Sequence, residues 1–284
     1  MSRERPHIEC AFAAHTTEAT HVTKPMSRMP AVFIGHGSPT NALAHNAVTE
    51  AWRSLGAALP RPRAILSVSA HWFTHGTFVT SNERPPTIHD FAGFPQALYE
   101  MRYDAPGDPA LAARVVELLA PDATRPVADW GLDHGTWSVL VHMYPQADIP
   151  VVQLSIDGTQ PAAVHYALGE RLAPLRDEGI LLLGSGGIVH NLARVDWGNA
   201  SPPPPWAVDF DERVRTCLQT GDDAALIDYG KLGDGARLAV PTPEHYLPLL
   251  YVLGCRRPGD VVSVPVKGFE LGTISMTAAV LGAG

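Results

Sequence analysis

The chain has 284 residues, a formal net charge of −8, 45% hydrophobic residues and 18% charged residues. This composition is typical of a globular protein and excludes a chain too polar to bury a core. The acidic balance disfavours nucleic acid and a polybasic membrane anchor as partners, and no apolar run approaches the about 18 residues of a membrane span. Three scattered cysteines predict neither disulfides nor a sulfur-ligated metal, and they are typical of a cytoplasmic protein.

Residues 1–30 differ from the rest of the chain. They carry His7, His15 and His21, many threonines and no hydrophobic period. Their longest apolar stretch, around Ala11, is too short for a secretory leader and follows mixed Arg and Glu residues. We therefore expect a disordered extension and leave its three histidines out of the site.

Short apolar runs alternate with helical stretches from residue 31 onward. Four runs are apolar throughout, as in strands buried on both faces: Ala31–Gly35, Ala64–Ala70, Val151–Ile156 and Ile180–Gly184. A later strand is expected over Phe269–Ala278.

Helix signals fall between these runs. Asp108 followed by Pro109 is typical of a cap and first helical residue, and predicts a helix over Leu111–Leu119. Further helices are expected from Thr159 or Pro161 to near Gly179, over 206–219 and over 244–254. Strand–helix alternation without a composition shift predicts one α/β domain over residues 31–284, with helices covering both faces of a sheet.

Three histidines come directly after apolar runs: His36 in GHGSP, His71 in SAHW and His190 in GSGGIVHN. Ligands in open α/β sheets bind at the carboxyl ends of the strands. Imidazole suits Fe, Zn, Cu or Ni. A single histidine at a strand end is a hydrogen-bonded loop residue about as often as it is a ligand. Each position taken by itself therefore leaves both interpretations open.

Two more histidines lie at predicted helix starts. His134, in GLDHGTW, is a candidate general acid or base, or simply a first helical residue capped by Asp133. His245 follows Thr242 as a candidate cap, so it would be held on a rigid first turn. Glu244 beside it either stabilises the helix dipole or supplies a carboxylate ligand.

The remaining motifs exclude several functions. GSGGIV ends in Val189 where a dinucleotide fingerprint needs Gly or Ala, and there is no phosphate-binding loop, no H-E-x-x-H and no nucleophile elbow. Nicotinamide, ATP and serine-hydrolase chemistry are disfavoured. We treat five other histidines as ordinary or undecided: His45, His75, His89, His142 and His165.

Six motifs in order resemble the DODA-type extradiol aromatic ring-opening dioxygenases, the 4,5-DOPA dioxygenase branch of the class III LigB-like superfamily. They are FIGHGSPTNAL (33–43), SVSAHW (67–72), HDFAGFPQALYEMRYDAPGDP (89–109), GLDHGTWSVL (131–140), LLLGSGGIVHNL (181–192) and PTPEHYLPLLYVLG (241–254). The resemblance runs from about residue 31 to the C-terminus.

This resemblance implies a single α/β domain with a central mixed, largely parallel sheet. It implies one divalent metal on His36, His71 and His245, with His190 as a fourth ligand or a close acid/base partner, and His134 as the acid/base. Such a His-rich set departs from the 2-His-1-carboxylate triad. Fe(II) is the active metal in the family, and Zn(II), which has no redox chemistry, is the other metal expected on isolation.

The resemblance also implies the substrates: a small-molecule catechol such as DOPA, and O₂. Residues expected to line an apolar pocket for the ring, unless they pack in the core, are Trp72, Phe91, Phe94, Trp137 and Tyr246. A zinc-dependent hydrolase using the same histidines is the alternative function. A metal-binding protein without turnover is a third. The oligomeric state and the physiological catechol stay open.

Overall fold

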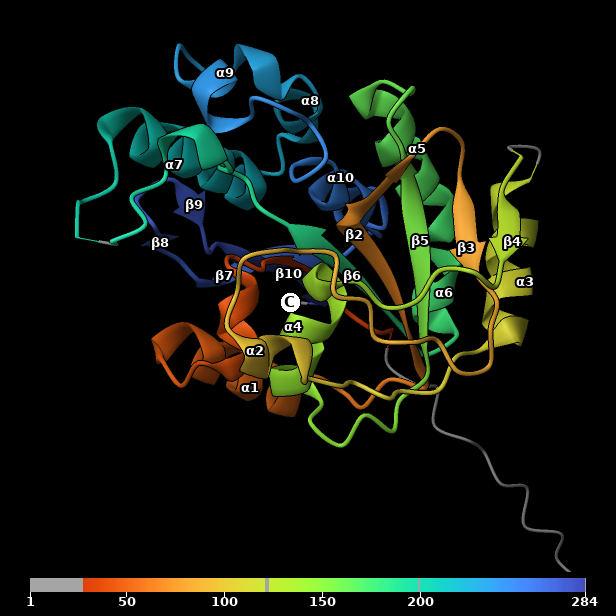
Figure 1. Cartoon of the computed structure of the whole chain (residues 1–284). Helices are drawn as coiled ribbons and strands as arrows, with labels where there is room; N and C mark the ends of the chain where they lie inside the picture. The colour runs from red at the N-terminus through yellow and green to blue at the C-terminus, as the bar shows by residue number, and fades with distance from the viewer. Residues whose placement is uncertain (1–27, 121–122, 199, 284) are drawn as a thin grey trace, which may run out of the picture.

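An eight-stranded sheet in the order β4-β3-β5-β2-β6-β1-β10-β7 forms the centre of the computed structural model (Figure 1), which describes residues 28–120, 123–198 and 200–283. Its strands are β1 (Ala31–Gly35), β2 (Ala64–Thr74), β3 (Phe78–Thr80), β4 (Arg125–Val127), β5 (Val151–Asp157), β6 (Ile180–Gly186), β7 (Asp260–Val266) and β10 (Ala278–Ala283). Strands β5, β2, β6 and β1 are parallel, and β10, β7 and β3 join antiparallel. The sheet is therefore mixed and largely parallel, as predicted.

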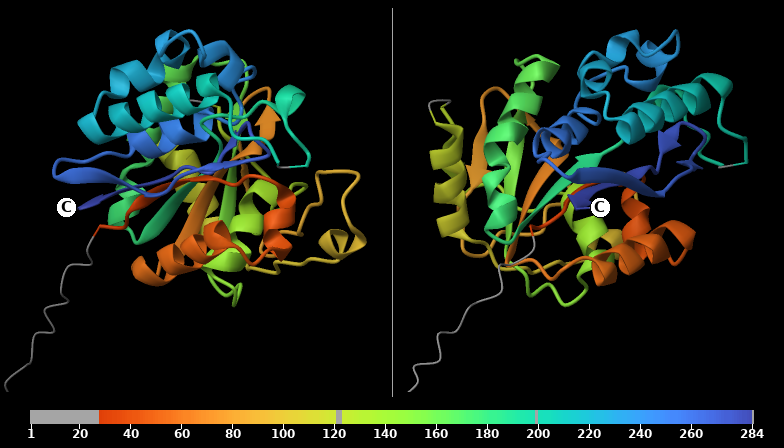
Figure 2. Two further views of the ribbon diagram at one scale, coloured as in Figure 1. Left: turned by 90° about the vertical axis from the view of Figure 1, so that its left-hand side faces the viewer. Right: turned by 180° about the vertical axis from the view of Figure 1, so that it is seen from behind.

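Helices cover both faces of this sheet (Figure 2). Their bounds are α1 (Ala47–Ala58), α2 (Gln96–Tyr99), α3 (Pro109–Leu119), α4 (His134–Met143), α5 (Ala162–Leu172), α6 (Pro174–Asp177), α7 (Pro205–Thr220), α8 (Asp223–Ile227), α9 (Ala236–Ala239) and α10 (Leu247–Gly254). Three short 3₁₀ turns are η1 (Pro39–Leu43), η2 (Leu192–Arg194) and η3 (Tyr229–Lys231). Within the described ranges, no helix combines the length and apolar character needed to cross a bilayer.

Alternate residues of the central strands divide the core in two. Ala31 and Phe33 of β1 pack with α3, α5, α7 and α10 on one face. Val32 and Ile34 pack with α1 and α4 on the other, where Trp52 is fully buried. Because successive side chains of a strand point to opposite faces, both sets are apolar and the run reads as continuously hydrophobic.

Local signals placed several elements correctly. β1 spans the predicted residues, and the Asp108 carboxylate accepts from Leu111 N at 2.9 Å as the predicted cap of α3. The helix expected from Thr159 or Pro161 is α5, followed by the short α6 that begins at Pro174. Strand β3 and the two edge strands β4 and β7 were not predicted, because they are short or only partly buried. His7, His15 and His21 lie outside the described residues.

Three expectations about element boundaries are wrong. Phe269–Ala278 is not one strand: Leu271 and Gly272 adopt positive φ values of 51° and 74°, which turn the chain into the hairpin of β8 (Phe269–Glu270) and β9 (Ile274–Ser275). The helix over 244–254 begins only at Leu247, because residues 243–246 form a turn. β2 does not end before His71 but continues to Thr74 through a register shift.

Candidate functional site

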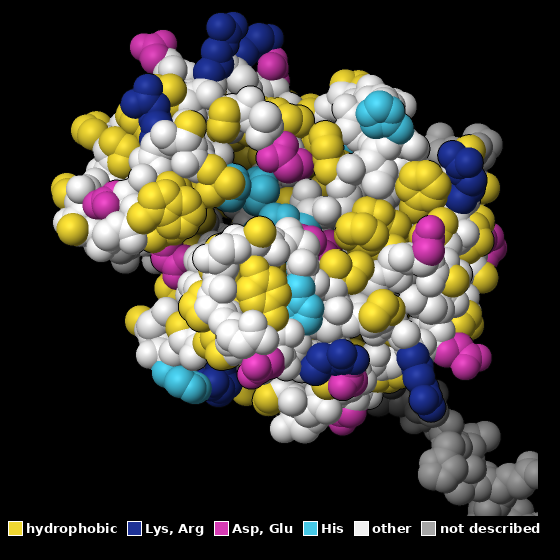
Figure 3. All heavy atoms as spheres, in the orientation of Figure 1, with side chains coloured by type: hydrophobic (Ala, Val, Ile, Leu, Met, Phe, Trp, Pro, Cys, Tyr) yellow, Lys and Arg dark blue, Asp and Glu magenta, His cyan; other side chains and the backbone are white. Residues whose placement is uncertain are grey.

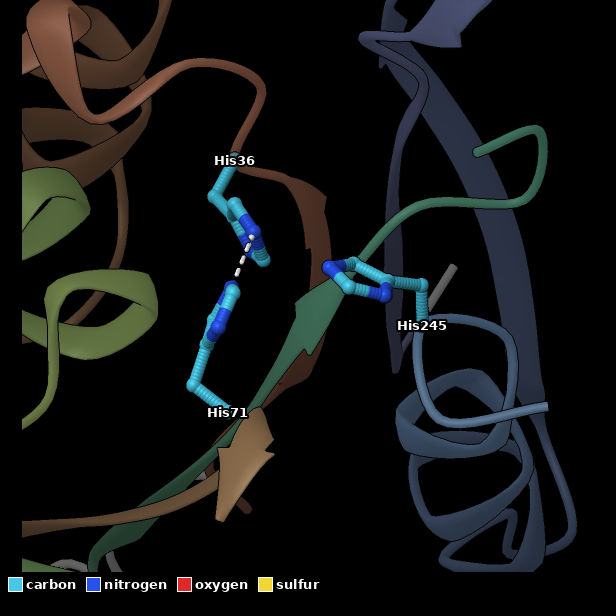
Figure 4. Close-up of side chains that lie close together, drawn as sticks. All are labelled: His36, His71 and His245. Carbon is cyan, nitrogen blue, oxygen red and sulfur yellow. Dashed lines mark hydrogen bonds between the residues drawn. The ribbon is translucent and has the colours of Figure 1, made fainter. Parts of the chain in front are cut away.

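Three histidines from distant parts of the chain meet at the carboxyl ends of the central strands. His36 follows β1, His71 lies in the irregular part of β2, and His245 precedes α10 (Figure 4). The Nε2 atoms of His36 and His71 are 3.0 Å apart, and one ring nitrogen of each of the three residues lies within 4.8 Å of the others. The predicted convergence of His36, His71 and His245 is present in the fold.

The tautomer of His36 follows from its neighbours. Its Nδ1 lies 2.9 Å from Ser185 Oγ, and that hydroxyl donates its only hydrogen to Gly135 O at 2.5 Å. Nδ1 must therefore donate to Ser185, which leaves Nε2 of His36 as a lone pair facing the other two rings. This is the arrangement that protein metal ligands adopt, with the outer nitrogen held by an acceptor.

His245 is oriented in the same way by Glu244. Its Nδ1 lies 3.1 Å from Glu244 Oε1, which also accepts from the Thr242 hydroxyl at 2.7 Å. Thr242 and Glu244 thus orient this ring, and the expectation that they cap the helix and stabilise its dipole is wrong, since α10 starts later. Nε2 of His245 is buried and has no hydrogen-bond partner among the described residues. A buried lone pair without a partner is costly unless a cation or donor meets it.

Burial keeps these imidazoles neutral. Burial is the largest cause that lowers the pKa of His71 to about 3 and that of His190 to about 4, both from an ordinary 6.5. The pKa values of His36 and His245 are likewise far below 6.5, first because of burial and then because of the neighbouring histidines. Neutral rings at neutral pH present the lone pairs that a divalent metal needs.

The GHGSP loop is held in place by a carboxylate from the β8–β9 hairpin. Glu270 Oε2 accepts from Ser38 N at 3.1 Å and from Asn41 Nδ2 at 2.9 Å. Gly37 between His36 and Ser38 has a φ of 63°, and a Cβ there would lie 2.5 Å from Glu270 Oε2. The glycine therefore allows the turn that directs His36 inward.

His134 is the first residue of α4 and faces the same site. Asp133 caps the helix by accepting from Thr136 N at 3.1 Å, as expected. Asp90 Oδ2 faces Nδ1 of His134 at 2.8 Å, and its Oδ1 accepts from the backbone N of His134 at 2.8 Å. The two bonds fix the ring with Nδ1 protonated and Nε2 available. His134 is thus both a first helical residue and a candidate base.

Asp90 was missed by the sequence analysis. It belongs to the HDFAGFP stretch, and a carboxylate beside a histidine in that motif was the signal that could have identified it. Its Oδ2 also lies 3.4 Å from Nδ1 of His71. One carboxylate therefore faces the outer nitrogens of two site histidines.

His190 is close to the three converging histidines but arranged differently. Its ring stacks on that of His245 with centroids 3.4 Å apart and planes 7° apart. Its ring nitrogen lies within 4.8 Å of ligand atoms of Glu244 and His245, but it does not belong to the set formed by His36, His71 and His245. Its backbone N donates to Ala239 O at 2.9 Å.

A cavity of about 270 Å³ lies in front of the histidines, at the hollow that Figure 3 shows around the cyan side chains. Its apolar wall consists of Phe91, Phe94, Leu192, Trp197, Leu271 and Ile274. Phe91 and Phe94 were predicted to line it. Leu192 and Trp197 were missed, because nothing local distinguishes an exposed apolar residue at a pocket from one elsewhere on the surface.

The other three predicted ring-binding residues belong to the core. Trp72 stacks on Trp130 with planes 7° apart, Trp137 Nε1 donates to Ile88 O, and the Tyr246 hydroxyl donates to Leu226 O. These three residues pack in the core, which was the alternative expected for them.

Three other histidines, of which His142 and His165 are buried, have ordinary partners. His142 Nε2 lies 2.8 Å from Asn41 O, and His165 Nδ1 lies 3.0 Å from the Tyr251 hydroxyl. His89 Nε2 lies 3.0 Å from Met101 O. Each of these contacts satisfies a ring nitrogen away from the cluster, in agreement with the structural role expected for them.

Comparisons with known proteins agree with the geometry. The family described as the catalytic LigB subunit of aromatic ring-opening dioxygenase matches residues 22–282. An Escherichia coli (strain K12) protein named 4,5-DOPA dioxygenase extradiol is 55% identical over 260 residues, covering 90% of this chain and 96% of that protein. A Beta vulgaris protein of the same name is 41% identical over 234 residues, covering 78% and 85%.

One solved structure is also similar to this chain. The crystal structure of an uncharacterized protein from Escherichia coli K12 matches with a TM-score of 0.80 and 50% sequence identity. The match covers 90% of this chain and 100% of that one.

Proposed function

The chain belongs to the LigB family of aromatic ring-opening dioxygenases, and we propose that it opens the ring of a catechol such as DOPA with O₂, at one divalent metal held by His36, His71 and His245. The membership makes it an extradiol dioxygenase. The metal, the substrate and the residue roles are the proposal.

One observation carries the metal assignment: three imidazoles direct nitrogens at one point, and the buried inner nitrogen of His245 has no partner among the described residues. His36 holds its proton on the outer nitrogen, and the outer nitrogen of His71 faces Asp90. The Nε2 atoms of His36 and His71 are 3.0 Å apart and joined by a hydrogen bond, and a divalent cation bound to both nitrogens would replace that bond. The residues therefore fit a divalent metal.

A metal bound there would lower the pKa of the catechol hydroxyls and, as Fe(II) but not Zn(II), supply the redox chemistry that O₂ requires. The protein supplies the base. Because Asp90 accepts from Nδ1 of His134, Nε2 is the nitrogen that takes a hydroxyl proton. His190 lies at the other side of the cluster, where one of its ring nitrogens would hold a second proton. We therefore assign His190 as an acid/base residue and not as a fourth metal ligand.

The pocket walls orient the ring. Phe91 lies edge-on to His134, with centroids 5.5 Å apart and planes 78° apart. Phe94 contacts Phe91 with centroids 5.3 Å apart. A flat substrate between this wall and the histidines would lose water from both faces, which favours an aromatic ring over a polar ligand.

The alternatives have less support. The Escherichia coli and Beta vulgaris relatives are both named as dioxygenases, so they give the zinc-dependent hydrolase no support. A metal-binding protein without turnover has the same cluster but needs neither Phe91 and Phe94 in the pocket nor the Asp90–His134 pair beside it.

Anaerobic reconstitution tests the proposal. Protein loaded with Fe(II) and mixed with DOPA in air is expected to consume one O₂ per ring and form a yellow ring-opened product, whereas the Zn(II) form is expected to bind the catechol without turnover. Iron-loaded protein that consumes no O₂ with any catechol would refute the dioxygenase assignment. Ester or amide hydrolysis by the Zn(II) form would favour the hydrolase instead.

A further inference from the structure

The described residues that line the pocket in front of the histidines carry no cationic side chain. Among the residues that the structure describes, those lining it include neither Lys nor Arg. In Figure 3 the dark blue side chains lie toward the margins of this face, and the central hollow is bordered by yellow and magenta ones. A substituent on a bound ring would therefore meet no positively charged side chain.

Carboxylates surround the site instead. Asp90 lines the pocket, Glu244 contacts His245, and Glu270 contacts Ser38, which is itself part of the pocket wall. Like charges placed close together in a site that excludes water repel each other strongly.

The cavity is larger than a bare catechol ring needs. A cavity of about 150 Å³ suffices for benzene, against about 270 Å³ here. The outer part is walled by Leu192 and Trp197, whose exposed fractions are 58% and 70%. A substituent placed there would remove apolar surface of both residues from water, which stabilises an uncharged group.

We propose, on the basis of the proposed function, that this site selects catechols whose ring substituent is neutral or cationic and discriminates against aromatic acids. A carboxylate in the outer pocket loses water, gains no Lys or Arg partner among the described lining residues and shares the pocket with Asp90. The ammonium group of DOPA partly offsets its own carboxylate. DOPA therefore ranks between dopamine, which lacks the carboxylate, and a simple catechol acid.

A matched pair of substrates isolates the charge. 3-(3,4-Dihydroxyphenyl)propionate and its primary amide have nearly the same shape and differ in charge. With iron-loaded enzyme, kcat/KM is expected to be at least about tenfold higher for the amide, which corresponds to about 1.4 kcal/mol. Calorimetric Kd values on the Zn(II)-loaded protein should follow the same order. Equal values, or a preference for the acid, would overturn the proposal.

A designed cation provides the second test. Leu192 lines the pocket and is exposed, so a polar residue there does not disturb the core. Leu192→Lys should reduce the amide-to-acid ratio at least about tenfold, whereas the matched control Leu192→Gln should leave the ratio unchanged. An unchanged ratio in the Lys variant, or an equal fall in both variants, contradicts the charge argument.

The two proposals fail separately. If iron-loaded enzyme turns over neither of these substrates nor any other catechol, the dioxygenase assignment is wrong, and the Kd ratio on the Zn(II)-loaded protein still decides the charge preference. If both substrates are cleaved at equal rates and bound equally, the function stands and the charge selectivity is refuted.

Discussion

Asp90→Asn removes the acceptor that holds His134 in the pocket. The carboxylate now contacts His134 through two 2.8 Å bonds, one to the ring and one to the backbone N–H. An amide has one acceptor oxygen, so one of these donors loses its partner. A lost hydrogen bond to a charged group costs about 1.5–3 kcal/mol, and the free energy of unfolding should fall by about that amount.

The effect on rate is expected to be larger. Without the carboxylate, the His134 ring is free to carry its proton on Nε2, and that nitrogen then accepts no proton from the catechol. Losing a general base lowers kcat about 10²–10⁴-fold. His134→Ala should cost about the same, because the two residues act as one unit. Metal affinity should fall about 10–100-fold, because Asp90 also faces the outer nitrogen of His71.

Oxygen uptake at saturating iron measures kcat, elemental analysis measures metal content, and ¹⁵N–¹H correlation spectra of the Zn(II)-loaded protein report the His134 tautomer. Asp129→Asn, which removes an exposed carboxylate, is the control and should change none of these. A kcat for Asp90→Asn within threefold of the parent, or a large loss of kcat with an unchanged tautomer, would refute the reasoning.

Three further predictions follow from the cluster. His36→Ala or His71→Ala should abolish metal binding measured by elemental analysis after dialysis, and the exposed control His75→Ala should not; full occupancy in both cluster variants would identify the wrong residues. Gly186→Ala places a Cβ 2.1 Å from His245 O and should weaken metal binding, whereas Gly187→Ala, with its nearest atom at 3.5 Å, should be tolerated; equal metal affinity in the two variants counts against this packing. The metal-free protein should lose stability in acid: His71 and His190 have folded pKa values of about 3 and about 4, below the unfolded 6.5, so their contribution is complete above pH 6.5 and is lost as the pH falls toward the folded values. Each histidine should lower the free energy of unfolding in urea by about 2 kcal/mol at pH 5 relative to pH 7.5. A His71→Asn, His190→Asn double variant should show a correspondingly weaker dependence of this free energy on pH. The same pH dependence in the parent and the double variant would contradict the assignment.

The sequence by itself determined the central strands, two helix caps and which histidines to examine. Strands buried on both faces must be apolar throughout, so Ala31–Gly35 and Ile180–Gly184 were visible as continuous runs. The Asp108 and Asp133 caps depend on a side chain and a backbone N–H three residues away, and such local chemistry is written in consecutive residues. His36 and His71 stood out because they follow apolar runs and His245 because it lies near a predicted helix start, and the family motifs grouped the three as metal ligands.

Only the tertiary structure decided how these residues work together. The Asp90–His134 pair joins residues 44 positions apart, and His36 depends on Ser185 at 149 positions. Contacts at such separations depend on strand register and loop path, which no local pattern specifies. The same holds for the β8–β9 hairpin, which places Glu270 behind the His36 loop, and for Leu192 and Trp197 at the pocket mouth. Residue type therefore indicated the chemistry, and the fold determined the atoms that perform it.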